Sequence, residues 1–228
     1  METKDKYTDF QCYLNDMKST LLAIGERVAK IHKDVNQYYD DKPYSYHLNA
    51  VAEYVIKYLP EILEKSEDII PVIFGAYFHD SIEDARLTYN DVLKIAKEYM
   101  SDKQAYVAAE IVYALTNEKG RNRHERANDK YYEGIRNTPY APLVKACDRL
   151  ANYNYAKKTK SKMVKCYEKE MQDFVDSIRA YSEGTNTISM VTYFPSLRTT
   201  LAKVEVDKRI LIPESLIIEL FNKEVPCE

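Results

Sequence analysis

Apolar residues recur at helical spacing along most of this chain, which predicts an all-α protein. One helix is expected to begin at Thr88, because the acidic residue Asp91 follows three positions later as in a capping box. Another is expected to begin at Thr138-Pro139 and to carry Asp148. Further helices are predicted over 13–33, over 45–59 with Ser45 as the cap and Pro60 beyond the end, over 102–115 and over 162–181.

A strongly apolar stretch, 69–78, runs directly into the motif His79-Asp80-Ser81-Ile82-Glu83-Asp84 and predicts a buried helix. If the helix continued, His79 would lie beside Glu83 and Asp80 beside Asp84 on one face. Carboxylates crowded in this way repel one another, and unpaired charge in a buried place is costly. A divalent cation would resolve the conflict. The alternative is a solvated acidic helix end, which is the commoner explanation of an isolated His-Asp pair.

The pattern changes near Ser182. Residues 1–182 are predicted to form one helical domain, and 183–228 a linker with a short C-terminal appendage of uncertain structure. Within the appendage, 210–221 predicts either a short helix or a strand followed by a helix, and we assign it no chemistry.

Composition narrows the class of protein. Hydrophobic residues make up 45% and charged residues 30% of the 228 residues, which is typical of a globular protein. The net charge of -3 argues against a nucleic-acid polymer as partner, although a local basic patch could bind a small phosphorylated molecule. The four cysteines form no CxxC pair, the first residues lack the apolar stretch expected of a signal peptide, and no apolar run approaches the length that spans a membrane. We therefore expect a cytoplasmic protein with no membrane contact; homo-oligomerisation is left open.

Asp148 lies in an otherwise apolar helical stretch, so it needs a partner when buried. Lys145 precedes it by three residues and Asn152 follows it by four, which places all three on one helical face. Pairing with Lys145 or Arg149 would be a purely structural explanation of this arrangement.

In this order, His47, His79-Asp80 with Glu83-Asp84, and Asp148 in a Lys-x-x-Asp-Arg-Leu-x-Asn frame resemble the HD-domain metal-dependent phosphohydrolases. The chain is most similar to the hydrolase domain of RelA/SpoT homologues and to the small alarmone hydrolases. Those proteins also have a histidine on the first helix, here His32, and a Pro-Tyr-x-x-His turn, here Pro43 to His47. The resemblance covers about 32–167 and implies an HD-type helical bundle.

The resemblance implies that one divalent metal ion is bound by His47, His79, Asp80 and Asp148. The ion is commonly Mn²⁺ in alarmone hydrolases, although Fe or Zn would suit the same ligands. Glu83 and Asp84 are implied as the catalytic pair, which orients and deprotonates water or protonates the leaving group. The residues implied or predicted to bind the substrate are Tyr44, Arg123, Lys145, Asn152 and Tyr167.

Arg123 belongs to a basic segment in which Arg123, Arg126 and Lys130 are predicted to share a helical face, with Arg121 beside them. Such a face could bind phosphate groups. The alternative is a solvated basic surface.

The chain departs from the family just before the Pro-Tyr turn. Tyr38-Tyr39 stand where alarmone hydrolases carry a basic pair and a glycine, and Ala85-Arg86 replace the usual threonine after Glu-Asp. Aromatic faces can stack on a base, and Lys42 can supply part of the missing charge. We therefore expect a (p)ppGpp-type 3′-pyrophosphohydrolase, with the reaction better supported than the substrate. The alternatives are a phosphatase of nucleoside monophosphates or of the NADPH 2′-phosphate, and a nucleotide-sensing module without turnover.

Overall fold

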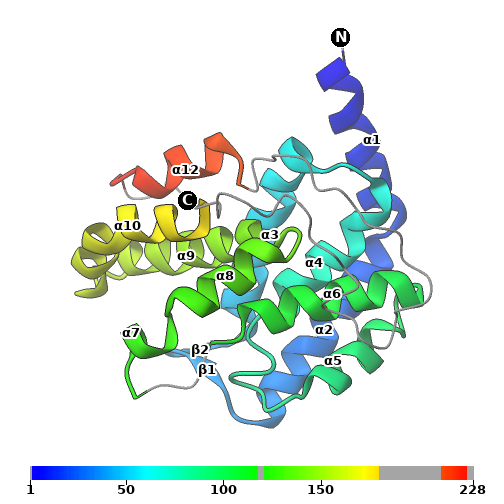
Figure 1. Ribbon diagram of the computed structural model, residues 1–228. Coiled ribbons are helices and arrows are strands. Elements are labelled where there is room, and N and C mark those ends of the chain that lie inside the picture. Colours follow the sequence, from blue (N-terminus) through cyan, green and yellow to red (C-terminus); the bar gives the residue numbers. More distant parts are fainter. Residues whose placement is uncertain (1, 118–120, 180–211, 225–228) are drawn as a thin grey trace.

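The computed structural model describes residues 2–117, 121–179 and 212–224, which form an all-α bundle as the sequence predicts (Figure 1). The helices are α1 (Glu2–Asp16), α2 (Lys18–Asp34), α3 (Ser45–Ile62), α4 (Ile69–Phe78), α5 (Tyr89–Ala96), α6 (Asp102–Leu115), α7 (Arg123–Arg126), α8 (Asp129–Asn137), α9 (Ala141–Lys158), α10 (Met163–Arg179) and α12 (Glu214–Phe221). A 3₁₀ turn, η1 (Ser66–Asp68), precedes α4, and two short antiparallel strands, β1 (Tyr38–Tyr39) and β2 (Lys42–Pro43), precede α3.

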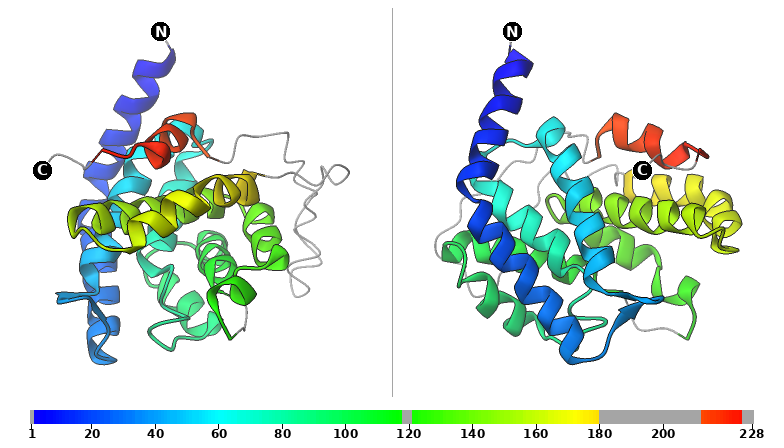
Figure 2. Two further views of the ribbon diagram at one scale, coloured as in Figure 1. Left: turned by 90° about the vertical axis from the view of Figure 1, so that its left-hand side faces the viewer. Right: turned by 180° about the vertical axis from the view of Figure 1, so that it is seen from behind.

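Helices α3 and α4 pack against each other at the centre of the bundle. Helix α9 covers α3, while α2 and α6 cover α4. Helix α5 lies outside α6, and α10 and α12 lie outside α9 (Figure 2). This order brings the first turn of α3, the end of α4 and the middle of α9 to one place.

Helix α4 is buried because neighbouring helices cover it on several sides. Val72, Ile73 and Phe74 have no exposed surface, as the continuous apolar sequence predicts. Gly75 allows α6 to approach closely, since a Cβ atom there would lie 2.6 Å from Cγ2 of Ile111. His79 directly follows the last residue of this helix and is buried.

The N-terminal half differs from the prediction in three ways. The helix expected over 13–33 is two helices that meet at Met17, and α1, whose Phe10 is buried, was not predicted. Ser45 is the first residue of α3 and makes no capping hydrogen bond, because Tyr44 occupies the cap position. Helix α3 also continues through Pro60, which is buried, to Ile62. Burial in the core there outweighs one lost backbone hydrogen bond.

The C-terminal residues that are described include the short helix α12, which both predicted alternatives contain; residues 210 and 211 lie outside the described ranges. Leu216, Ile217 and Leu220 bury its inner face. The Lys157 ammonium of α9 donates hydrogen bonds to the backbone carbonyls of Asn222, at 2.9 Å, and Glu224, at 2.7 Å. The predicted linker that follows Ser182 lies outside the described residues, as do the last two residues of the helix expected over 162–181.

Candidate metal centre

Three elements bring His47, His79, Asp80 and Asp148 together. His47 lies in the first turn of α3, His79 and Asp80 directly follow α4, and Asp148 lies in α9. The Nε2 atoms of the two imidazoles are 3.3 Å apart. Oδ2 of Asp80 is 3.0 Å from Nε2 of His79 and 3.6 Å from Nε2 of His47. Oδ1 of Asp148 is 3.3 Å from Nε2 of His47 and 3.8 Å from Nε2 of His79.

The separations among His47, His79 and Asp80 suit donor atoms that share one ion. Atoms bonded at about 2.1 Å to a metal are about 3.0 Å apart along an octahedral edge and about 3.4 Å along a tetrahedral edge. His47, His79 and Asp80 form a group, with both imidazoles buried, that can hold a metal ion. Asp148 lies beside this group, within reach of both imidazoles.

The orientation of His79 is fixed by the backbone. Its Nδ1 lies 2.8 Å from the carbonyl oxygen of Ala76, which only accepts, so Nδ1 carries the proton and Nε2 presents a lone pair to the site. That carbonyl is the one to which the Asp80 amide would bond if α4 continued. Without an ion, burial opposes the charged imidazole, but the Asp80 carboxylate outweighs burial and raises the pKa of His79 to about 9.

The predicted helical face over 79–84 is therefore wrong in its geometry. Helix α4 ends at Phe78, and the following residues form tight turns, with the Ser81 amide bonded to the Phe78 carbonyl at 2.9 Å. Asp80 and Asp84 nevertheless remain neighbours, since the Asp84 amide bonds to the Asp80 carbonyl at 2.8 Å. The imidazole of His79 bonds to the Ala76 carbonyl, which the next helical amide would otherwise use. The spacing of apolar residues does not predict this contact.

Tyr44 links Asp80 to Asp84. Its hydroxyl lies 2.6 Å from Oδ2 of Asp80 and 2.8 Å from Oδ2 of Asp84. A hydroxyl has one proton to donate, so only one of the two carboxylates can accept it at a time. Burial raises the pKa of Asp84. The Tyr44 hydroxyl therefore couples the two carboxylates through the one proton that it can donate to either.

The Glu83 side chain contacts Asn117 and Arg126 and none of the candidate ligands. Its carboxylate accepts hydrogen bonds from the Asn117 side-chain amide at 2.8 and 3.1 Å and lies 3.6 Å from the Arg126 guanidinium. The structure does not place Glu83 among the ligands. Asn117 was missed by sequence reasoning because its contact joins segments far apart in the chain.

The expected partners of Asp148 are present. Nζ of Lys145 lies 3.0 Å from Oδ2 of Asp148, and Nδ2 of Asn152 lies 2.6 Å from Oδ1. Arg149, the other predicted partner, turns instead toward Glu170. Burial opposes the charged lysine, but Tyr131 and Asp148 outweigh it and raise the pKa of Lys145. Lys145 is thus a fixed positive charge beside the ligands.

The predicted basic face is wrong, because Arg123 and Arg126 belong to α7 whereas Lys130 lies on α8. The side chain of Arg123 lies outside the described residues. Tyr167 lies on α10, where its ring packs 5.1 Å from the Arg149 guanidinium.

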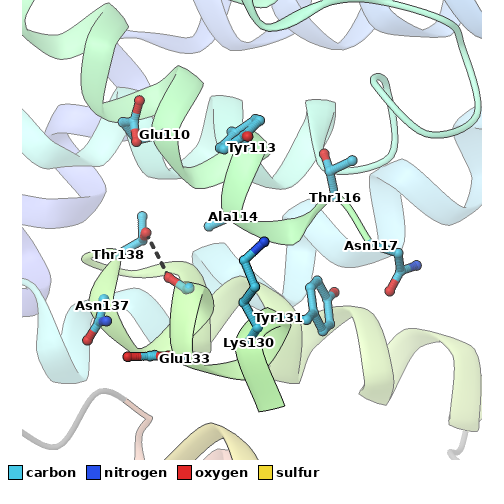
Figure 3. A pocket seen from close by; sticks show the side chains of 11 residues that line it. Glu110, Tyr113, Ala114, Thr116, Asn117, Lys130, Tyr131, Glu133, Asn137 and Thr138 are labelled. Carbon is cyan, nitrogen blue, oxygen red and sulfur yellow. Dashed lines mark hydrogen bonds between the residues drawn. The ribbon is translucent and has the colours of Figure 1, made fainter. Parts of the chain in front are cut away.

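A pocket of about 570 Å³ lies between α6 and α8 (Figure 3). Lys130 extends across it toward α6, and Gly134 leaves space open along α8. At one end of the pocket are Asn117, which binds Glu83, and Tyr131, whose ring lies 5.7 Å from Nζ of Lys145. Two side chains that line the pocket therefore contact the candidate catalytic residue Glu83 and the candidate substrate-binding residue Lys145.

Comparison of the chain with protein-family models, curated proteins and solved structures found no match. The resemblance to HD-domain hydrolases stays a prediction. Within the described ranges, no helix has both the length and the apolar character needed to cross a membrane.

Proposed function

We propose that the chain is a metal-dependent phosphohydrolase of the HD type that acts on a nucleotide, with Mn²⁺ as its ion and a (p)ppGpp-type 3′-pyrophosphate as the first substrate to test. The observation that carries the proposal is the convergence of two imidazole nitrogens and two carboxylates from three separate elements. A bound divalent ion would supply a water of lowered pKa and a contact for a phosphoryl oxygen.

Two acidic residues outside the ligand set carry the proton chemistry. Asp84, which the Tyr44 hydroxyl links to Asp80, is the acid that protonates the leaving oxygen. Its raised pKa supports this role. Glu83, whose carboxylate is held by Asn117 and Arg126 and not beside the ligands, is assigned the role of orienting the attacking water by the resemblance alone. Lys145 offsets the negative charge of Asp148 and leaves the site able to accept an anionic substrate.

The surroundings of His47 support a nucleotide as substrate. Tyr46, the residue before it, has 40% of its surface exposed, and the Lys42 ammonium lies 5.4 Å from the centroid of its ring. An exposed ring can stack on a base, and a nearby ammonium can pair with phosphate.

The test is turnover by protein stripped of metal and reloaded with Mn²⁺, measured on guanosine 3′,5′-bis(diphosphate), nucleoside monophosphates and NADPH. We expect release of pyrophosphate or phosphate, which Asp80→Ala and Asp148→Ala abolish. The matched control is Asp102→Asn, an exposed carboxylate that pairs with Lys97 away from the site and should leave turnover unchanged. Nucleotide binding with no hydrolysis of any compound would contradict the enzyme proposal and favour a sensing module. Full activity in Asp80→Ala or Asp148→Ala would contradict the metal site.

A further inference from the structure

The two imidazoles of the candidate metal centre are held in different ways. Nδ1 of His79 is bonded to the Ala76 carbonyl, which is the usual way of orienting a ligand imidazole. Nδ1 of His47 is buried and has no hydrogen-bond partner among the described residues. Something other than a hydrogen bond at Nδ1 must therefore set the plane of the His47 ring.

Tyr39 of β1 lies against that ring. The ring centroids of Tyr39 and His47 are 4.8 Å apart and the planes differ by 11°, so the two rings are stacked face to face. On the tyrosine side the stack is supported by Tyr155, 4.7 Å away, and by Tyr46, 6.3 Å away. The stack leaves the His47 imidazole little freedom to rotate.

The hydroxyl of Tyr39 reaches a second candidate ligand through one intermediate. It donates to Oδ1 of Asn152 at 2.8 Å, and Nδ2 of Asn152 donates to Oδ1 of Asp148 at 2.6 Å. Because Oδ1 of Asn152 accepts from the tyrosine, the amide is oriented with its nitrogen toward the carboxylate. One side chain thus contacts His47 directly and Asp148 through Asn152.

We propose that Tyr39 is a positioning residue of the metal centre, whose ring fixes the His47 imidazole and whose hydroxyl, through Asn152, fixes the Asp148 carboxylate. The inference rests on the metal site of the proposed function. In this role the short strand β1 supports the bound ion through Tyr39, which is separate from contact with the substrate.

The experiment is a titration of metal-stripped protein with Mn²⁺, in which free Mn²⁺ is followed by electron paramagnetic resonance. Tyr39→Phe keeps the stacked ring and removes the hydroxyl, and we expect an affinity about 10-fold weaker. Tyr39→Leu removes the stack as well, and we expect a loss approaching about 100-fold. The matched controls are Tyr38→Phe and Tyr38→Leu on the same strand, because Tyr38 is 62% exposed, and both should bind Mn²⁺ as the wild type does.

Two further readouts separate positioning from general destabilisation. Loading with Co²⁺ gives visible absorption bands that report the geometry around the ion, and these should shift in Tyr39→Phe and remain unchanged in Tyr38→Phe. Tyr39→Phe combined with Asn152→Ala should weaken Mn²⁺ binding by less than the product of the single effects, since both act along one path to Asp148.

The outcomes distinguish this inference from the proposed function. A wild-type protein that binds no Mn²⁺ overturns the metal site and the role of Tyr39 together. Wild-type binding, with Tyr39→Phe and Tyr39→Leu both equal to it in affinity and in the Co²⁺ spectrum, overturns the role of Tyr39 alone. Tyr39→Phe retains the packed ring and is expected to fold, which unfolding in the presence of chelator will verify.

Discussion

His32 and Tyr44 stack in the protein interior with ring centroids 4.5 Å apart and planes 8° apart. The side chain of His32 is fully buried, and neither of its nitrogens has a hydrogen-bond partner among the described residues. Burial lowers the pKa of His32 to about 4, despite the opposing effect of the Asp80 carboxylate. His32 is therefore held neutral in the folded protein.

This burial predicts a loss of stability on acidification. An unfolded histidine titrates near pH 6.5, so between about pH 6.5 and pH 4 the unfolded chain binds a proton that the folded protein rejects. The free energy of unfolding should fall across this range by about 3 kcal/mol from His32 alone. His32→Phe, which retains a ring against Tyr44, should remove that part of the pH dependence. Urea unfolding from pH 4 to pH 7, with chelator present, measures the difference between the two proteins. If the unfolding free energies of the wild type and of His32→Phe changed equally with pH, the prediction would be contradicted.

Metal should raise the stability of the folded protein, because the unfolded chain lacks an assembled site. At an Mn²⁺ concentration 100-fold above the dissociation constant, the gain in unfolding free energy should be about 2.7 kcal/mol. Thermal unfolding before and after treatment with EDTA measures it. Asp148→Asn should show a smaller shift, and Asp102→Asn should respond like the wild type. If neither Mn²⁺ nor EDTA changed the melting temperature of the wild type, the result would contradict the metal centre.

Two glycines are expected to respond oppositely to alanine. A Cβ atom at Gly134 would meet nothing within 4 Å, so Gly134→Ala should stabilise helix α8 by about 0.5–1 kcal/mol. A Cβ atom at Gly75 would lie 2.6 Å from the Ile111 side chain, so Gly75→Ala should destabilise the bundle by about 1–3 kcal/mol. Urea unfolding of both variants measures these changes. A destabilised Gly134→Ala would mean that α8 packs more closely than the structure describes.

Helix α12 should contribute to the stability of the main bundle. Leu216 is fully buried, and Leu216→Ala should lower the free energy of unfolding by about 2–4 kcal/mol. Ile218, two residues later on the same helix, is 66% exposed, and Ile218→Ala should change stability by at most about 0.5 kcal/mol. Chemical denaturation compares the two. Equal, small effects would show that α12 is not docked in solution.

The sequence predicted those features that depend on local spacing. Thr88 and Asp91 form the expected capping box, because its groups lie within one turn of chain. Lys145 and Asn152 reach Asp148 for the same reason, being one helical turn away on either side. The completely apolar stretch 69–78 likewise predicted the buried helix α4.

Features that depend on contacts between distant segments could not be read from spacing. The hydrogen bond of Glu83 to Asn117 and the stack of Tyr39 on His47 arise only when whole helices dock. The end of α4 was misjudged because the apolar pattern gives no signal for it; at that end the His79 imidazole bonds to the Ala76 carbonyl, which a continuing helix would use.

The hydrogen bond between Tyr39 and Asn152 joins residues 113 positions apart. During synthesis, β1 and β2 leave the ribosome long before α9 does, so Asp148 can join His47, His79 and Asp80 only after α9 has been made. An ion held by both His47 and Asp148 would act as a removable cross-link in the folded protein, closing a loop of roughly a hundred residues. Binding of the ion by all four side chains would therefore require the two halves of the bundle to have docked.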